Sequence, residues 1–298
     1  MSRGETQHVP VLLEEVLEGL DLKPGRTYVD GTLGGGGHTR RIAERIQPGG
    51  HVFSLDRDRA AVEAAQKSLA GLPVTPLWAD YRDIALVLED IERKTVDGIL
   101  IDIGLSSDQL ADAARGFSFN ADGPLDLRFD VTEGIPAAEL IAKKEEEDLA
   151  DLIYKFGEER FSRRIAKAIV ERRKTTPIAT AGELAEIVRR AVPRTPDSDR
   201  IHPATRTFQA LRIAVNDELG ALEQFLRDAP RCLPIGGRVA VITFHSLEDR
   251  IVKHAFRDDP RWEAINRKPI EAGEAELAAN PRARSAKLRI AARSAVDI

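Results

Sequence analysis

Three aspartates and a run of glycines stand directly after short apolar segments in the first third of the chain. Asp30 opens a loop of sequence DGTLGGGGH, Asp56 ends the apolar segment His51–Asp56, and Asp102 ends another such segment. Glycines at such a position let the backbone approach a ligand closely. A carboxylate that ends a neighbouring strand can accept hydrogen bonds from both hydroxyls of a ribose. We interpret these residues as an adenosine-binding site.

The glycine loop favours one adenosine compound over another. A dinucleotide-binding loop follows the pattern G-x-G-x-x-G, and with Gly34 and Gly36 as its first two glycines the third position is Thr39. The pattern D-x-G-x-G-x-G of methyltransferases fits better, because Asp30, Gly34 and Gly36 match and only Thr32 replaces a glycine. S-adenosylmethionine is therefore the favoured cofactor. An NAD-dependent oxidoreductase and a glycine turn without a ligand remain alternatives.

The residues that could perform a methyl transfer differ with the target atom. Methylation of cytosine at ring carbon 5 requires a cysteine nucleophile, but the single cysteine, Cys232, lies far in sequence from the aspartates and is interpreted as a buried apolar residue. Transfer to an exocyclic amine requires only an acceptor for its proton. The motif D/N/S-P-P-Y/F of many amino-methyltransferases is absent after Asp102, where the chain reads IGLSS. The candidate proton acceptors, among which none is assigned, are Asp102, Ser106, Ser107, Asn216 and Glu218.

Short apolar strands that alternate with helical patterns must position these residues. Such alternation predicts a parallel sheet covered by helices on both faces. The predicted strands are 27–30, 51–56, 74–79, 96–102, 238–244, 262–266 and 287–292. The predicted helices include 39–46, 59–69, 84–92, 158–173, 181–192, 205–227 and 247–256. Because residues 111–206 contain no convincing buried strand, we predict a discontinuous domain of residues 1–110 and 207–298 with a helical insertion at 111–206.

Basic residues are concentrated in two segments, although the formal net charge is −5. Residues 160–206 carry twelve Lys/Arg and five Asp/Glu, and the segment from Arg282 to Arg293 adds five basic residues and no acid. Such local excess is typical of a phosphate-binding surface, although solvated helix faces would give the same counts. The insertion is therefore expected to help hold RNA.

Other sequence features limit the class of protein. No apolar run approaches the ~20 residues that span a bilayer, and no secretory signal core begins the chain. One cysteine allows no intramolecular disulfide, and no His/Cys/carboxylate spacing predicts a metal site. We expect a cytoplasmic protein without a membrane partner and without a metal. The sequence leaves the oligomeric state open.

Long blocks of the sequence resemble one family along almost the whole chain. The blocks are HVPVLL from His8, the Asp30 loop, LDRD from Leu55, DGILIDIGLSSDQL from Asp97, RGFSF and DGPLD between Arg115 and Asp126, GEERFSRRIAKAI from Gly157, HPATRTFQALRIAVNDEL from His202, FHSLEDRIVK from Phe244, and NPRARSAKLR from Asn280. The chain thus resembles the MraW (RsmH) family. Members of this family transfer a methyl group from S-adenosylmethionine to the N4 amine of a cytidine in the decoding region of bacterial 16S rRNA.

The resemblance implies a fold, a partner and a set of cofactor residues. The fold is the class I methyltransferase fold, a Rossmann-like α/β fold with a seven-stranded sheet, and the partner is 16S rRNA or the small ribosomal subunit. The implied cofactor residues are Gly36, Gly37, His38, Asp56, Tyr81, Asp102 and Gln109. Asp56 would hold the ribose, Tyr81 would lie beside the adenine, and the glycines with His38 would line the methionine end. A non-enzymatic assembly factor that keeps this fold and binds RNA is the alternative.

Overall fold

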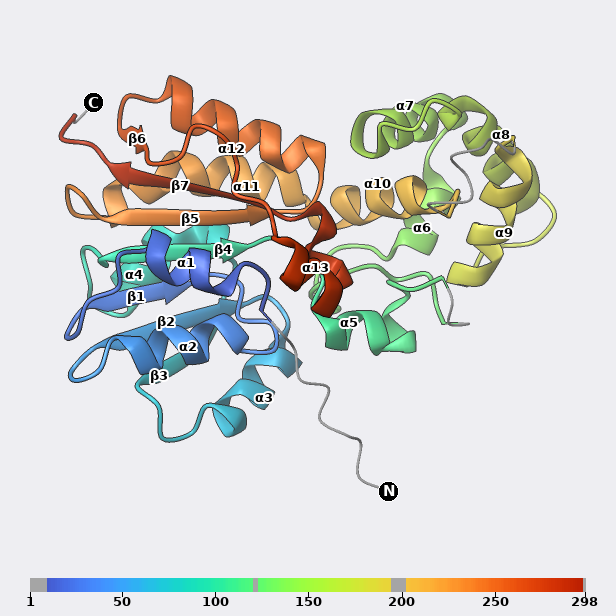
Figure 1. Cartoon of the computed structure of the whole chain (residues 1–298). Coiled ribbons are helices and arrows are strands. Elements are labelled where there is room, and N and C mark those ends of the chain that lie inside the picture. The colour runs from blue at the N-terminus through green and yellow to red at the C-terminus, as the bar shows by residue number, and fades with distance from the viewer. Residues whose placement is uncertain (1–9, 120–122, 194–201, 297–298) are drawn as a thin grey trace. The chain divides into compact units, whose positions relative to one another are not determined.

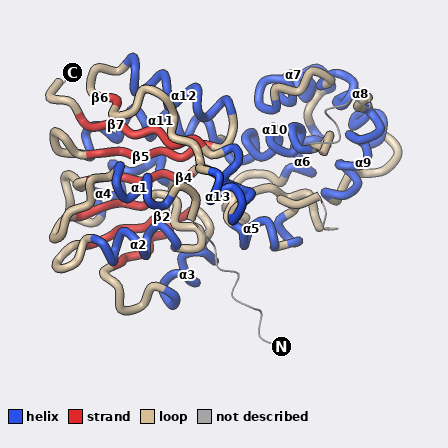
Figure 2. Tube along the Cα trace, in the orientation of Figure 1, coloured by secondary structure: helices blue, strands red, loops and turns tan. Residues whose placement is uncertain are grey.

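A computed structural model describes residues 10–119, 123–193 and 202–296 of the 298-residue chain. Packing divides the chain into two compact units. We call residues 1–105 with 219–298 the sheet unit, and residues 106–218 the helical unit. Figures 1 and 2 show the strands in the first and the helices of the second.

The sheet unit is built on one seven-stranded sheet with the order β3-β2-β1-β4-β5-β7-β6. Strands β1 to β5 run parallel, while β7 is antiparallel to both β5 and β6. The predicted seven-stranded α/β fold is therefore confirmed. The strands are β1 (Thr27–Asp30), β2 (His51–Asp56), β3 (Val74–Trp78), β4 (Gly98–Asp102), β5 (Arg238–Thr243), β6 (Trp262–Ala264) and β7 (Lys287–Arg293).

Alternating side chains of the central strands divide between two cores, one on each face of the sheet. In β4, Ile99 and Ile101 join the core under α4 (Ile84–Asp90), α11 (Glu218–Asp228) and α12 (Ser246–Asp258). Leu100 joins the opposite core, under α1 (Leu13–Gly19) and α2 (Gly37–Arg45). This double covering explains why the central strands are apolar at nearly every position. The parallel direction of β1 to β5 places their carboxyl ends along the same edge of the sheet.

The helical unit contains short helices and no strand within its described residues. Helix α7 contacts both α8 and α10, and α8 contacts α9. Gly157, the last residue of α7, allows close approach, because a Cβ there would lie 2.5 Å from the carbonyl oxygen of Arg206. The helices are α5 (Ser107–Ala111), α6 (Ala137–Lys143), α7 (Glu146–Gly157), α8 (Ser162–Arg173), α9 (Ala181–Ala191) and α10 (Thr205–Asn216).

The predicted continuous helix over residues 205–227 is wrong. The chain forms α10 and α11 there, separated by Asp217 in the left-handed conformation with φ 49°. Aspartate tolerates this conformation better than most residues. The packing boundary also differs from the predicted one at residue 206, because α10 contacts α7 and belongs to the helical unit. Within the described residues, no helix is both long and apolar enough to cross a bilayer.

Candidate active site

Asp30, at the end of β1, is a structural residue of the glycine loop. Its side chain is buried, and both carboxylate oxygens are hydrogen-bonded. Oδ1 accepts from the amide of Thr32 at 3.1 Å, and Oδ2 accepts from the hydroxyl of Thr39 in α2 at 2.6 Å. The carboxylate thus ties the start of the loop to the helix that follows it.

The glycines of the loop are required by backbone conformation and by space. Gly36, the N-cap of α2, has φ 76°, which favours glycine. A Cβ at Gly31 would lie 2.4 Å from Cδ1 of Ile101 and 3.0 Å from Cβ of Tyr81. A side chain at Gly31 would therefore require Ile101 and Tyr81 to shift.

Asp56, at the end of β2, holds the same loop from the other side. Its Oδ2 accepts from the amide of Gly34 at 2.9 Å, and its Oδ1 accepts from the amide of Asp58 at 2.8 Å. Burial raises the pKa of Asp56 to about 6, against these two backbone hydrogen bonds, which lower it. Each carboxylate oxygen has two lone pairs. The Asp56 carboxylate therefore retains capacity to accept hydroxyl donors.

Tyr81 lies just beyond the end of β3, as the first residue of the short 3-10 helix η1 (Tyr81–Asp83). Its ring packs edge-on against Phe225 of α11, with ring centroids 5.7 Å apart. This contact fixes an aromatic surface at the edge of the sheet where β1 and β4 also end.

Asp102, at the end of β4, is the least satisfied of the three aspartates. Its side chain is 17% exposed, and its Oδ1 is buried without a hydrogen-bond partner among the described residues. Its Oδ2 lies 3.6 Å from Nδ1 of His38. Burial raises the pKa of Asp102 to about 6.

His38, in the first turn of α2, is held in one orientation. The side chain is 6% exposed, and Nε2 lies 2.9 Å from the carbonyl oxygen of Val11. A carbonyl can only accept a hydrogen bond, so Nε2 is the protonated nitrogen of the neutral ring. Nδ1 consequently faces Asp102.

A family model described as the MraW methylase family matches residues 5–294 of the chain. The chain belongs to this family. It is 51% identical over 303 aligned residues to a Rhodopirellula baltica protein named "Ribosomal RNA small subunit methyltransferase H", with 98% of this chain and 93% of that protein covered. A Deinococcus deserti protein of the same name is 52% identical over 291 residues, covering 97% of this chain and 94% of that protein.

This member of the MraW methylase family is thus a methyltransferase, and S-adenosylmethionine is its methyl donor. The sheet unit fits that cofactor. The Asp56 carboxylate, which can accept hydroxyl donors, and the aromatic ring of Tyr81 both lie at the strand ends. Within the described residues, no group of three His, Cys, Asp or Glu side chains could hold a metal ion.

Three of the predicted site residues of the MraW family member begin the helical unit. Ser106 and Gln109 form a capping box at the start of α5. The Ser106 hydroxyl accepts from the amide of Gln109 at 3.1 Å, and Oε1 of Gln109 accepts from the amide of Ser106 at 3.0 Å. Ser107 is the first residue of this helix. The structure thus assigns Ser106 and Gln109 a local structural role, and their catalytic or cofactor-binding role stays a prediction.

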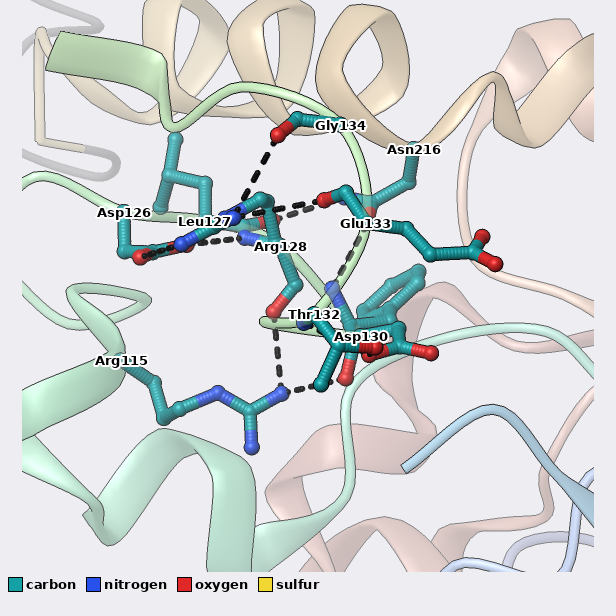
Figure 3. Close-up of polar contacts among 10 residues, drawn as sticks. Arg115, Asp126, Leu127, Arg128, Asp130, Thr132, Glu133, Gly134 and Asn216 are labelled. Carbon is teal, nitrogen blue, oxygen red and sulfur yellow. Dashed lines mark hydrogen bonds and ion pairs between the residues drawn. The ribbon is translucent and has the colours of Figure 1, made fainter. Parts of the chain in front are cut away.

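Asn216, a predicted proton acceptor, clamps a loop within the helical unit. Its amide nitrogen donates to the carbonyls of Leu127 and Arg212, both within 2.9 Å, and its oxygen accepts from the amide of Phe129 at 2.7 Å. Figure 3 shows this side chain reaching the loop that carries Arg128 and Asp130. Both amide hydrogens and an oxygen lone pair are therefore used in shaping that loop.

Sequence reasoning assigned no role to the other residues that hold this loop. Arg115 donates to the carbonyls of Arg128 and Phe129, and Arg128 forms an ion pair of 2.8 Å with Asp126 (Figure 3). Leu127, between them, has φ 64°. The sequence DGPLD carried only the turn signal of its glycine and proline, which does not specify these partners.

Glu218, the remaining predicted proton acceptor, is 5% exposed and pairs with Arg212 at 2.9 Å. This buried ion pair spans Asp217, where α10 ends. Removing one partner of a buried pair is costly because the other charge is left uncompensated. The observed contact therefore stabilises the junction of α10 with the residues that follow.

Three of the five basic side chains between Arg282 and Arg293 are bonded within the sheet unit, which reduces the phosphate-binding surface expected from their charge. Arg289 is buried and pairs with Asp249 at 2.7 Å. Arg293 is also buried and donates to the carbonyl of Pro230, while Arg282 donates to the carbonyl of Leu105. These side chains hold β7 and its preceding turn to the rest of the sheet unit.

Some basic side chains of the segment 160–206 are bonded to carbonyls or acids, and others are exposed without an ion pair among the described residues. Arg173 donates to the carbonyls of Ile141 and Lys144. Arg189 and Arg190 both pair with Glu186 in α9. In contrast, Arg163 and Arg164 are exposed on α8 and form no ion pair within the described residues. Arg194 and Arg200 lie outside the described residues.

Proposed function

We propose that the chain methylates the N4 amine of a cytidine in the decoding region of 16S rRNA. The observation that carries this proposal is about 50% identity over nearly the whole chain to proteins named "Ribosomal RNA small subunit methyltransferase H". The substrate is ribosomal RNA, free or within the small subunit. We place its activity in the cytoplasm, where bacterial ribosomal RNA is found.

We assign the cofactor to the strand ends of the sheet unit. Gly36, Gly37 and His38 hold the methionine end, and Asp56 accepts hydrogen bonds from the ribose. Tyr81 provides an aromatic surface for the adenine, and Asp102 completes this set of residues in the sheet unit. Gln109, in the helical unit, stays a predicted cofactor residue. When bound, S-adenosylmethionine supplies an activated methyl group. The protein's task is then to place the amine and accept its proton.

The environment of Cys232 supports transfer to an amine over transfer to ring carbon 5. The thiol is buried in the 3-10 helix η4 (Ala229–Cys232), within the core under α4 and α11. Burial raises the pKa of Cys232 to about 11. A thiol is nucleophilic only as the thiolate, and at neutral pH this group is protonated. Carbon-5 chemistry therefore has no suitable nucleophile here.

The helical unit supplies the RNA-binding surface in this proposal. Arg160, Arg163, Arg164 and Lys167 are exposed on or beside α8. The guanidinium of Arg160 lies over the ring of Phe161, with 4.7 Å between them. Basic side chains of this kind neutralise phosphates and release counterions, which favours binding.

Mass spectrometry of cytidines from 16S rRNA tests the proposal. A strain that lacks the chain should lose an N4-methylated cytidine, and the wild-type chain should restore it. Asp56→Ala, which removes the proposed ribose acceptor and weakens cofactor binding, should restore the modification less completely than the wild type. Unchanged N4 methylation in the deletion strain would refute the substrate. If a variant that cannot bind the cofactor restored normal subunit assembly in the deletion strain, a non-enzymatic assembly factor would be favoured.

A further inference from the structure

The three strand-end aspartates differ in how their carboxylates are used. Asp30 and Asp56 accept hydrogen bonds on both oxygens. Among the described residues, the buried Oδ1 of Asp102 has no hydrogen-bond partner, and Nδ1 of His38 lies 3.6 Å from its Oδ2. A buried acceptor without a partner is costly and rare in folded proteins. Asp102 is therefore the strand-end acid with a carboxylate oxygen that no described residue uses, and this oxygen can accept a hydrogen bond from a donor on the substrate.

His38 directs Nδ1, the ring nitrogen whose protonation can change, toward Asp102. Because the Val11 carbonyl fixes the proton of Nε2, any second proton on the ring must reside on Nδ1. That proton would lie between Nδ1 and Oδ2, whose separation is 3.6 Å. A charged ring at this distance favours the ionised form of the carboxyl.

Charged groups from four elements surround Asp102. Besides burial, Asp30 of β1 and Glu248 of α12 raise the pKa of Asp102. His38 of α2 and Arg282 of the 3-10 helix η5 (Pro281–Ser285) lower it, and His38 has the larger effect of the two. Removing His38 should therefore leave Asp102 protonated to higher pH.

We propose that Asp102 accepts the proton that the target amine loses, and that His38 is the positioning residue that keeps Asp102 ionised for this step. The inference rests on the proposed function for the identity of the amine. As the nitrogen–methyl bond forms and the sulfur–methyl bond breaks, the nitrogen acquires a positive charge. An N–H bond then breaks, and its proton passes to Oδ1 of Asp102. Protonated Asp102 subsequently releases the proton to water.

Two substitutions of His38 distinguish its effect on the ionisation of Asp102 from a purely structural contribution to packing. In His38→Gln the side-chain amide can reach the Val11 carbonyl, but no group remains at the position of Nδ1. In His38→Asn the shorter amide can place an N–H donor near Oδ2 of Asp102. The proposal therefore predicts that His38→Asn behaves more like the wild type than His38→Gln does, although neither side chain can carry a ring proton.

The first measurement is carbon-13 NMR of aspartate carboxyl groups in the full-length protein without cofactor or RNA. The Asp102 signal is identified by its loss in Asp102→Asn. Its titration midpoint should be higher by about one pH unit in His38→Gln than in the wild type, with His38→Asn between them. Coincident midpoints in the wild type and His38→Gln would overturn the proposal.

A second test uses the wild-type protein and does not depend on any His38 variant, once Asp102→Asn has identified the Asp102 signal. Nitrogen-15 signals of His38 should show both ring nitrogens protonated at a pH where the Asp102 carbon signal is that of a carboxylate. A ring with an unprotonated Nδ1 beside ionised Asp102 would contradict the proposal.

The pH dependence of methyl transfer to small-subunit RNA connects the pair to turnover. The acidic limb of kcat should move upward in pH by about one unit in His38→Gln, while His38→Asn recovers part of the difference. An unshifted limb in a folded His38→Gln protein would refute the role of His38. No methyl transfer by the wild type would instead refute the proposed function, and the NMR result would stand separately.

Discussion

At the scale of single residues, the accepting capacity of Asp56 leads to a prediction for cofactor binding. Asp56→Ala should weaken S-adenosylmethionine binding by roughly 1.5–3 kcal/mol, because the charged hydrogen bonds to the ribose are removed. Isothermal calorimetry measures this change directly. Asp56→Asn is the matched control, because it retains one oxygen acceptor for the loop amides. An unchanged Kd in Asp56→Ala would remove Asp56 from the cofactor site.

The raised pKa of Asp102 leads to a prediction for stability. Its pKa is about 6 in the folded chain and near 3.8 when unfolded. The carboxyl therefore favours folding below pH 4, and this contribution disappears as the pH rises through 6. Asp102→Asn should be more stable than the wild type at pH 7.5, by about 2–3 kcal/mol, while its methyl transfer is abolished.

Denaturant unfolding at two pH values checks this expectation. The stability difference between Asp102→Asn and the wild type should shrink when both are measured at pH 4, where the aspartate is largely protonated in the folded state. A wild type that is more stable than Asp102→Asn at pH 7.5 would mean that the charge of Asp102 is compensated by its neighbours.

Substitution of Cys232, unlike that of Asp102, is expected to leave methyl transfer intact. Because its thiol is buried and protonated at neutral pH, Cys232→Ala should retain methyl transfer and reduce only packing stability. Turnover measured on folded protein is the relevant assay. Complete absence of turnover in that protein would favour carbon-5 chemistry.

At the scale of elements, α8 offers the clearest test of RNA binding. Arg163→Gln with Arg164→Gln should reduce the magnitude of the slope of log affinity against log salt by about 0.7–0.9 for each phosphate that is no longer neutralised. Affinity for S-adenosylmethionine should hardly change. Arg189→Gln with Arg190→Gln is the control, since these arginines are paired with Glu186. Equal effects of the two double substitutions would argue against a specific surface on α8.

The loop held by Asn216 gives a second prediction at this scale. Asn216→Ala leaves the amide of Phe129 and the carbonyl of Leu127 without their partner, which costs about 1–3 kcal/mol for each buried group left unpaired. Hydrogen exchange should accelerate in residues 124–134. Unaltered exchange combined with abolished turnover would instead favour Asn216 as a proton acceptor.

Sequence patterns predicted the strands well because each central strand is a short apolar run that ends at a polar residue. They did not predict the break at Asp217, because the apolar spacing of α10 continues into α11 without a glycine or proline at the junction. Charge counts also failed at Arg289 and Arg293, which are buried and bonded within the sheet unit. Sequence gives the number of charges in a segment but not their partners.

The candidate proton acceptors also show that sequence does not reveal contacts between distant segments. Asp102 and His38 were predicted as site residues, but their separation and the role of the Val11 carbonyl depend on three segments far apart in sequence. Conversely, the spacing of Ser106 and Gln109 is that of a capping box, a local signal that was readable from sequence. Local hydrogen bonds are accessible to sequence reasoning, whereas contacts between distant segments require the fold.

At the scale of the whole molecule, the acidic net charge hides an uneven distribution. The exposed arginines that the proposal assigns to RNA lie in the helical unit, whereas the cofactor aspartates lie in the sheet unit. Substitutions of the exposed arginines of α8 should therefore alter RNA binding and leave cofactor binding nearly unchanged, and substitutions of Asp56 should do the reverse. Measuring both equilibria for each variant tests this separation directly.

The order of the strands also has a consequence for how the nascent chain folds on the ribosome. Strand β4 pairs with β5, yet residues 103–237 are synthesised between them. At the usual 5–20 residues per second, β4 waits on the order of ten seconds with one edge unpaired. The helical unit is complete within this interval, and an exposed strand edge invites pairing with other chains. We therefore expect this protein to depend most on chaperones during the interval between the synthesis of β4 and that of β5.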